Sequence, residues 1–187
     1  MTATRATPAA RPAGEEAEGF FQDPPRLTNT FEADAPLSET LERLVAPEIR
    51  DRLLPSWREM GEEAASGLLE LARAAQAEPP RHVPFDAWGR RVDEIVVAPA
   101  WKELHRAAAR WGLTAIPYEQ DLGRFARIHQ FALLHLYAPS SAIYTCPLAM
   151  TDGAVRTLRE HDPGLAGRVV PRLPAATRTR SGRAANG

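Results

Sequence analysis

The stretch that decides the fold is PFDAWGRRVDEIVVAPAW, residues Pro84 to Trp101. Its first half predicts a β-hairpin, because apolar residues flank the polar turn DAWG at 86–89, and Gly89 can adopt the positive φ that a tight hairpin turn needs. Its second half predicts the start of a helix, since Pro99 has no N–H to leave unbonded in a first turn. The apolar residues expected on the two strands are Val83, Phe85, Val92, Ile95, Val96 and Val97. The stretch therefore predicts a small hairpin inserted between helices.

Before the hairpin, the sequence predicts amphipathic helices. Asp34 is a suitable N-cap for a helix that has Pro36 in its first turn. Pro47 and Pro55 are expected to restart the chain twice, which gives a short segment and then a long helix. The apolar stripes are Leu37, Leu41, Leu44 and Val45 in the first helix, and Trp57, Met60, Ala64, Leu68, Leu71 and Ala75 in the long one.

After the hairpin, a helix from Pro99 is expected to end at Gly112, where a left-handed C-terminal cap belongs. The segment 122–137 is apolar on most sides, which predicts the most buried helix of the bundle. Ser140 or Ser141 is expected to cap a last helix at about 143–159, which Pro147 should kink. The fold class predicted is mainly α, a bundle of five to six helices with one small β-hairpin.

Composition places the chain among ordinary globular proteins. Of the 187 residues, 25% are charged and 44% hydrophobic, and the net charge is −1, so nucleic acid is not an expected partner. The N-terminal MTATRATPAARPAG has no apolar core of a secretory signal, and no apolar run is long enough to span a bilayer. The single cysteine, Cys146, fits a reducing compartment. We therefore expect a cytoplasmic protein that does not enter membranes.

Two segments carry a family resemblance, GRRVDEIVVAPAWKELHRAA at 89–108 and YTCPLAMT at 144–151. They resemble the N-terminal helical domain of the alkylation-response (AidB-type) branch of the acyl-CoA dehydrogenase flavoprotein family. The resemblance covers about 23–173, and the domain is placed at 24–173. Residues 1–23 are rich in Ala, Pro, Gly and Glu, and residues 174–187 are basic with no large apolar residue, so both predict disordered tails.

The resemblance implies a longer enzyme in which the helical domain precedes a central β-domain and a C-terminal helical domain. Such enzymes remove an α-proton from an acyl-CoA-like substrate with a carboxylate base and pass the β-hydride to FAD, and they form homo-oligomers. In the family, the helix that corresponds to 144–151 approaches the flavin and acyl cleft. The possible cleft-lining residues are Tyr144, Cys146, Pro147, Met150 and Thr151. Without the resemblance, Cys146 would be interpreted as a small buried hydrophobe.

The sequence also departs from the family. The Gly-Gly-Ser-Asp segment that binds flavin does not occur in it, and the basic tail suggests a truncated or frameshifted gene end. We therefore assign no catalytic, cofactor-binding or metal-binding residue, and expect FAD in the full-length family but none on this chain alone. The chain is predicted to be the N-terminal domain of an FAD-dependent oxidoreductase, inactive in isolation. An exposed apolar face near Tyr144, Pro147, Met150 and Thr151 is expected to promote its self-association. The alternative is a free-standing helical interaction module derived from that domain.

Other chemistry-bearing residues favour structural roles. The histidines show no metal-ligand spacing, since His129 and His135 are six residues apart and not on one helical face. Glu59, Glu62 and Glu63 fall on a predicted solvated face, which favours solubility over acid–base chemistry. No Gly-rich phosphate loop and no nucleophile elbow occurs.

Overall fold

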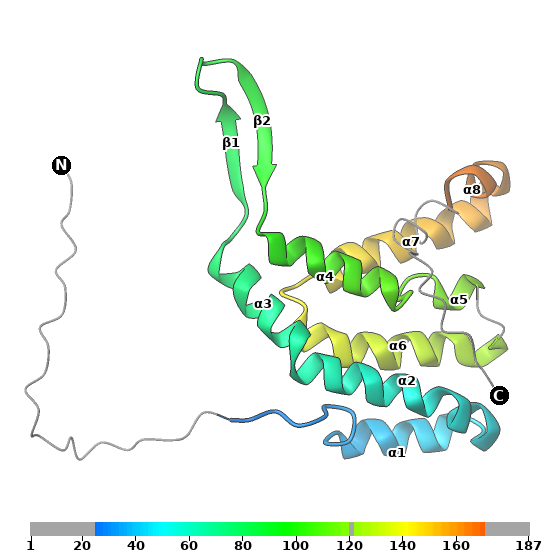
Figure 1. Ribbon diagram of the computed structural model, residues 1–187. Helices are drawn as coiled ribbons and strands as arrows, with labels where there is room; N and C mark the ends of the chain where they lie inside the picture. Colours follow the sequence, from blue (N-terminus) through cyan, green and yellow to red (C-terminus); the bar gives the residue numbers. More distant parts are fainter. Residues whose placement is uncertain (1–24, 120–121, 171–187) are drawn as a thin grey trace, which may run out of the picture.

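The computed structural model describes residues 25–119 and 122–170, which form a helical bundle with one hairpin (Figure 1). The six longer helices agree with the predicted five to six, and α5 and α8 are short additions. The elements are α1 (Ala35–Leu44), α2 (Pro47–Ala65), α3 (Gly67–Ala77), β1 (Arg81–Phe85), β2 (Arg91–Val96), α4 (Pro99–Arg110), α5 (Ile116–Glu119), α6 (Ala126–Tyr137), α7 (Thr145–His161) and α8 (Pro163–Val169). Short 3-10 turns, Gly123–Phe125 and Ala138–Ser140, flank α6.

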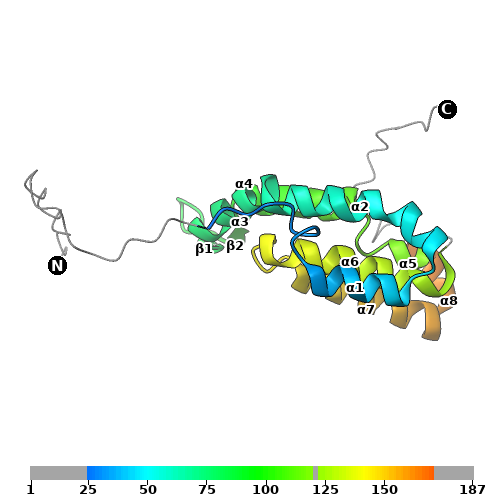
Figure 2. The ribbon, with the colours of Figure 1, turned by 90° about the horizontal axis from the view of Figure 1, so that it is seen from below.

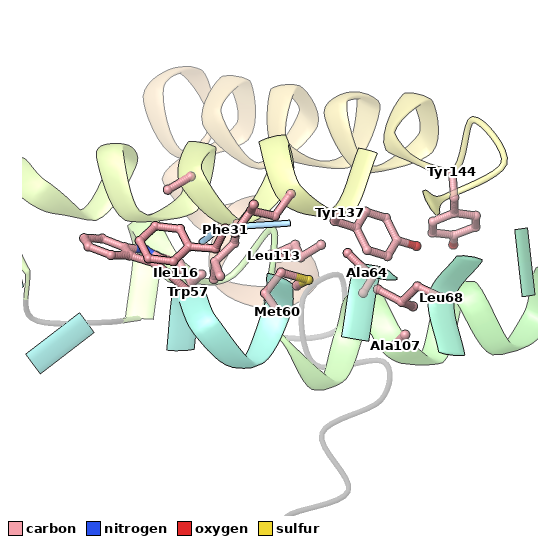
Figure 3. Packing of buried hydrophobic residues seen from close by; sticks show 14 of the residues in the cluster. Phe31, Trp57, Met60, Ala64, Leu68, Ala107, Leu113, Ile116, Tyr137 and Tyr144 are labelled. Atoms are coloured by element: carbon pink, nitrogen blue, oxygen red, sulfur yellow. The ribbon is translucent and has the colours of Figure 1, made fainter. Parts of the chain in front are cut away.

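The helices form two layers, α2, α3 and α4 in one and α1, α6 and α7 in the other (Figure 2). The core lies between the layers, where Trp57 and Met60 of α2 are fully buried near Leu113 and Ile116 (Figure 3). Tyr137 at the end of α6 is also fully buried, and its hydroxyl donates to the carbonyl of Leu104 at 3.0 Å. Burying the large apolar side chains of both layers in one cluster is the main term that stabilises such a domain.

The hairpin is confirmed, and it projects away from the helical layers (Figure 1). β1 and β2 pair antiparallel, and Gly89 has the expected positive φ of +80°. The carboxylate of Asp86 accepts hydrogen bonds from the backbone N–H groups of Trp88 and Arg90, each at 2.9 Å, which stabilises the turn. Trp88 at the tip is 81% exposed.

Two helix ends that the sequence predicts, at Asp34 and at Gly112, are confirmed. Asp34 caps α1, because its carboxylate accepts a hydrogen bond from the N–H of Leu37 at 2.9 Å. Gly112 has a φ of +62°, and the N–H of Leu113 bonds the carbonyl of Ala108 at 3.1 Å, as in a left-handed helix end.

The long helix is divided differently from the prediction. Pro55 lies inside α2 rather than at a helix start, and the chain breaks instead at Ser66, with φ −124° and ψ −100°. An interior proline removes one backbone hydrogen bond, and here the apolar side chains on both sides of Pro55 hold the helix in the core. The expected single stripe is therefore carried by two helices, α2 and α3.

The start of α7 corrects two expectations. Neither serine caps α7, because the hydroxyl of Ser140 donates to the carbonyl of Ala64 at 2.7 Å and that of Ser141 to Ala138 at 2.8 Å. Since α7 begins at Thr145, Pro147 lies in its first turn, where an N–H has no helical partner to lose, so no kink is required. The prediction that the helix in 122–137 is the most buried is confirmed, because α6 has the most buried residues of any described element. Its Phe131 is nevertheless 61% exposed, so one side of this apolar helix is uncovered.

Candidate functional site

A groove of about 900 Å³ runs between α6 and α7, and we call it the α6–α7 groove. Its walls are mostly apolar, and polar side chains lie along part of it. The lining residues are Thr114, Arg127, Gln130, Phe131, Leu134, His135, Ala138, Thr145, Cys146, Leu148, Ala149, Asp152, Gly153 and Arg156. An apolar concave surface of this size is the usual setting for a ligand or a docked polypeptide segment.

A second groove of about 350 Å³ lies on the other side of α6, against α1. Leu37, Leu41 and Leu44 of α1 line it, and Arg127, Phe131 and His135 of α6 line both grooves. These three residues therefore form a ridge between the grooves, with Phe131 as its apolar member. We call the two grooves and this ridge the docking face, and it belongs to the layer of α1, α6 and α7 (Figure 2).

A polar network fixes one end of the α6–α7 groove. Arg127 of α6 forms an ion pair with Asp152 of α7, and it also donates to the Tyr118 hydroxyl at 2.8 Å and to the Gln130 side chain at 2.8 Å. Burial opposes the charge on Arg127, but the hydrogen bonds to Asp152 and Tyr118 outweigh it and raise the pKa of the guanidinium. Burial, followed by the Asp152 carboxylate, raises the pKa of Tyr118. The network ties α5, α6 and α7 together at this wall of the groove.

The loop that leads into α7 is held against α4. The Tyr144 hydroxyl hydrogen-bonds His105, and its ring packs edge-on against Trp101 with ring centroids 5.1 Å apart. Burial raises the pKa of Tyr144. Just before it, Ala142 and Ile143 have positive φ values of 45° and 69°. This backbone is uncommon for any residue other than glycine, and most of all for a β-branched one.

The five candidate cleft residues take different positions. Cys146 is exposed and lines the α6–α7 groove, whereas Tyr144 is buried against α4 (Figure 3). Met150 is 72% exposed, and Thr151 is half-buried, with its hydroxyl donating to the carbonyl of Pro147 at 2.9 Å. The structure thus brings only Cys146 of the five into this groove. A cleft-lining role for the set stays a prediction.

Two contacts that join separate elements were missed from the sequence. Gln130 is fully buried within the apolar α6, and its side-chain amide donates to the carbonyl of Leu113 at 2.8 Å. A glutamine inside an otherwise apolar helix was the available signal. Glu63, interpreted as a solvated residue, accepts hydrogen bonds from Trp111 at 2.6 Å and from Arg110 at 2.7 Å, so it joins α2 to α4. Nothing in its spacing indicated a partner 47 residues away.

The residues of the α6–α7 groove do not by themselves fit FAD. The flavin ring and pyrophosphate need several free hydrogen-bond donors, usually backbone N–H groups at a helix start or Gly-rich turn. Here the guanidinium of Arg127 is bonded to Asp152, Tyr118 and Gln130, and Arg156 is paired with Glu160 at 3.2 Å. Among the residues that the structure describes, no group of three His, Cys, Asp or Glu side chains could hold a metal ion.

The structure defines a helical bundle domain with an inserted hairpin and one uncovered apolar face. A family model described as the adaptive response protein AidB N-terminal domain matches residues 22–178, and the chain belongs to this family. It is 40% identical over 141 residues to acyl-CoA dehydrogenase family member 11 of Caenorhabditis elegans. It is 30% identical over 145 residues to the putative acyl-CoA dehydrogenase AidB of Escherichia coli K12.

Solved structures resemble the bundle closely. Bd2924 in its apo form superposes with a TM-score of 0.80 at 44% identity, over 85% of this chain and 32% of that one. The C. elegans protein ACDH-11, solved in complex with C11-CoA, superposes with a TM-score of 0.79 at 36% identity, over 88% of this chain and 29% of that one. The two sequence relatives are matched over 75% and 76% of this chain but only 23% and 26% of their own lengths. The chain thus spans about a quarter of the length of these relatives.

None of the described helices combines the length and the apolar character needed to cross a membrane.

Proposed function

We propose that this chain is the N-terminal helical domain of an FAD-dependent acyl-CoA dehydrogenase-like oxidoreductase, and that its docking face packs against the other domains of such an enzyme. The observation that carries the proposal is the uncovered apolar surface of α6, where Phe131 is 61% exposed between two apolar grooves. Large exposed apolar side chains gathered on one concave face are typical of an interface.

In this proposal, residues 24–173 make up the domain, and the start of α7 supplies one wall of the acyl-CoA and flavin cleft. Tyr144, Cys146, Pro147, Met150 and Thr151 are the proposed wall residues. Cys146 would face the cleft directly, since it is exposed in the groove, and Tyr144 would act from behind by fixing the start of α7 against α4.

We further propose that a polypeptide of these 187 residues alone neither retains FAD nor oxidises acyl-CoA. This chain supplies only one wall of the cleft, which leaves the opposite polar edges of FAD without hydrogen-bond partners. The affinity of the isolated chain for FAD should therefore be low. Within such a polypeptide, the docking face should be covered by a second copy. The single cysteine and the near-neutral charge support a cytoplasmic protein with no affinity for nucleic acid.

The experiment compares the 187-residue polypeptide with a fusion protein and with two variants of that fusion. The 187-residue polypeptide should be colourless and inactive toward acyl-CoA thioesters with an artificial electron acceptor. A fusion that continues after Leu173 with the part of the C. elegans relative beyond its matched region should purify yellow. The same fusion with Phe131→Glu should lose flavin, because a charge on the ridge prevents docking, whereas Ile95→Thr on the hairpin should not. Stoichiometric FAD on the 187-residue polypeptide would contradict the proposal.

The second candidate function is a free-standing interaction module derived from this domain. The exposed docking face supports it equally, because the same apolar surface could bind a separate partner protein. The fusion decides between the two: a folded fusion that stays colourless favours the module.

A further inference from the structure

The last two helices are packed less deeply than the rest of the bundle. Helix α7 has 17 residues, of which only Val155 is buried, whereas seven of the 12 residues of α6 are buried. In α8, which stands at the outer end of α7, only Ala166 is buried (Figure 1). A segment with few buried apolar side chains opens at a lower free energy than the core of its domain. We call residues 145–170 the α7–α8 arm.

The buried side chains of the arm form a small cluster of their own. Val155 packs with Ala166 and Val170, and Tyr118 of α5 covers them from the bundle side. This cluster is separate from the main core, against which the arm places the partly buried Leu148. Because α7 and α8 share a cluster that is not part of the main core, they can move together without disrupting that core.

The polar attachments of the arm meet at one residue, Asp152. Its carboxylate forms the ion pair with Arg127 of α6, and it accepts hydrogen bonds from the Tyr118 hydroxyl at 2.6 Å and from the Gln130 side chain at 3.4 Å. Within 25–119 and 122–170, every side-chain hydrogen bond between the arm and the rest of the bundle ends at Asp152. Asp152 therefore has the position of a latch that holds α7 against α5 and α6.

The start of the arm is fixed, and the latch lies in the groove itself. Tyr144, directly before α7, is buried and hydrogen-bonded to His105 of α4, so it is a firm point about which the arm can turn. The arm supplies one wall of the α6–α7 groove and α6 supplies the other. Arg127 and Asp152 line opposite walls, so their ion pair joins the two walls. Release of this pair would let the groove widen.

We propose that the α7–α8 arm is a gate of the α6–α7 groove. It opens as a unit about Tyr144 when Asp152 releases Arg127, and it closes when the ion pair forms again. The main core stays folded in both states, because the arm contributes little to that core. The inference goes beyond the proposed function, since the gate does not depend on which partner occupies the groove.

The test is the rate at which a buried cysteine reacts with a thiol reagent, in the Cys146→Ser background. Val155→Cys reports opening of the arm, and Met60→Cys reports unfolding of the core, since both wild-type side chains are fully buried. Urea unfolding of each variant corrects the rates for the stability that the substitution removes. Val155→Cys should react about a hundredfold faster than Met60→Cys, with a weaker dependence on urea, because arm opening exposes less surface than unfolding.

A third cysteine distinguishes opening of the whole arm from fraying of its end. Ala166→Cys on α8 should react within about threefold of the rate of Val155→Cys, because one opening event exposes both. A much faster reaction of Ala166→Cys would mean that α8 frays alone, which overturns the gate. Equal rates and equal urea dependence for Val155→Cys and Met60→Cys would overturn it too, because the arm would then open only when the whole domain unfolds.

The latch is tested by adding Asp152→Asn to the Val155→Cys protein. Asparagine keeps the size of the side chain but loses the charge that pairs with Arg127, so the reaction should become about tenfold faster. The corrected rate of Met60→Cys should stay within about twofold. Glu160→Gln is the matched control, because it removes an exposed carboxylate that pairs with Arg156 inside the arm, and it should change neither rate by more than about twofold. Equal effects of Asp152→Asn and Glu160→Gln would overturn the assignment of Asp152 as the latch.

Discussion

Gly61 is the residue at which the N-terminal segment meets helix α2. Its carbonyl accepts a hydrogen bond from the N–H of Thr30 at 3.1 Å, and Asn29 bonds the neighbouring carbonyl of Arg58 at 2.9 Å. A Cβ at position 61 would come within 2.2 Å of the Asn29 side chain and 2.7 Å of the Phe31 backbone nitrogen. The close approach of two backbones explains why a glycine stands inside this helix.

We therefore expect Gly61→Ala to destabilise the protein by about 3 kcal/mol, because the clash involves backbone that cannot move without detaching the segment. Urea unfolding would measure this free energy. Gly153→Ala is the matched control: a Cβ at this position in α7 meets nothing within 4 Å, and alanine should stabilise the helix by ~1 kcal/mol. A neutral Gly61→Ala would show that the segment does not pack as described.

His129 should make stability depend on pH. It is buried, and its Nδ1 accepts a hydrogen bond from Trp57 Nε1 at 3.0 Å, so the neutral ring is the form that fits. Burial, helped by Arg52, lowers the pKa of His129 from 6.5 to about 4. Between these values the unfolded chain binds a proton that the folded chain does not, so the free energy of unfolding falls as the pH falls from 6.5 towards 4.

The loss over this interval should be about 3 kcal/mol, and urea unfolding at several pH values would measure it. His129→Gln keeps an acceptor for Trp57 without a titrating ring, so this slope should largely disappear. His161→Gln, which removes an exposed imidazole, is the control and should retain the slope. An unchanged slope in His129→Gln would mean that another group titrates.

At the scale of the elements, α2 shows how packing overrides a local signal. Pro55 occurs inside this 19-residue helix, and Leu53 and Trp57 on either side of it are both buried. The sequence correctly indicates that Pro55 costs α2 one backbone hydrogen bond. The core contacts of α2 stabilise the helix by more than this loss, so the helix continues through Pro55. Pro47, Pro99 and Pro163, in contrast, all stand at helix starts, where proline has no bond to break.

Pro55→Ala should accordingly raise the free energy of unfolding by ~2 kcal/mol, because alanine restores a helical N–H at this exposed position. This gain exceeds the loss that comes from the greater conformational entropy of an unfolded chain without the proline. Chemical denaturation would measure the change. Pro147→Ala serves as the control, because its first-turn N–H would find no helical acceptor, and its effect should be near zero. Equal effects of the two substitutions would contradict this account of α2.

At the scale of the whole molecule, the predicted domain boundaries can be tested directly. Residues 1–23 and 174–187, expected to be disordered tails, lie outside the described residues. If 24–173 is a complete folding unit, a chain cut to these residues should have a Tm within about 2 °C of the 187-residue polypeptide. Thermal unfolding followed by circular dichroism would measure it. A markedly lower Tm, with loss of cooperativity, would place part of the domain in a tail.

The sequence by itself determined the mainly helical class, the hairpin and the helix ends at Asp34, Pro99 and Gly112. These features depend on interactions within a few residues, such as a cap or a φ that glycine accepts. The family resemblance also followed from local motifs, at 89–108 and 144–151.

Only the tertiary structure decided the docking face, the bond from Glu63 to Trp111 and the network of Arg127, Asp152 and Tyr118. Each depends on which helices become neighbours, which is a property of the packing of the whole chain. The same reason explains Phe131: an apolar helix looks equally suited to burial on every side, and only the arrangement of α1 and α7 leaves one side of α6 exposed.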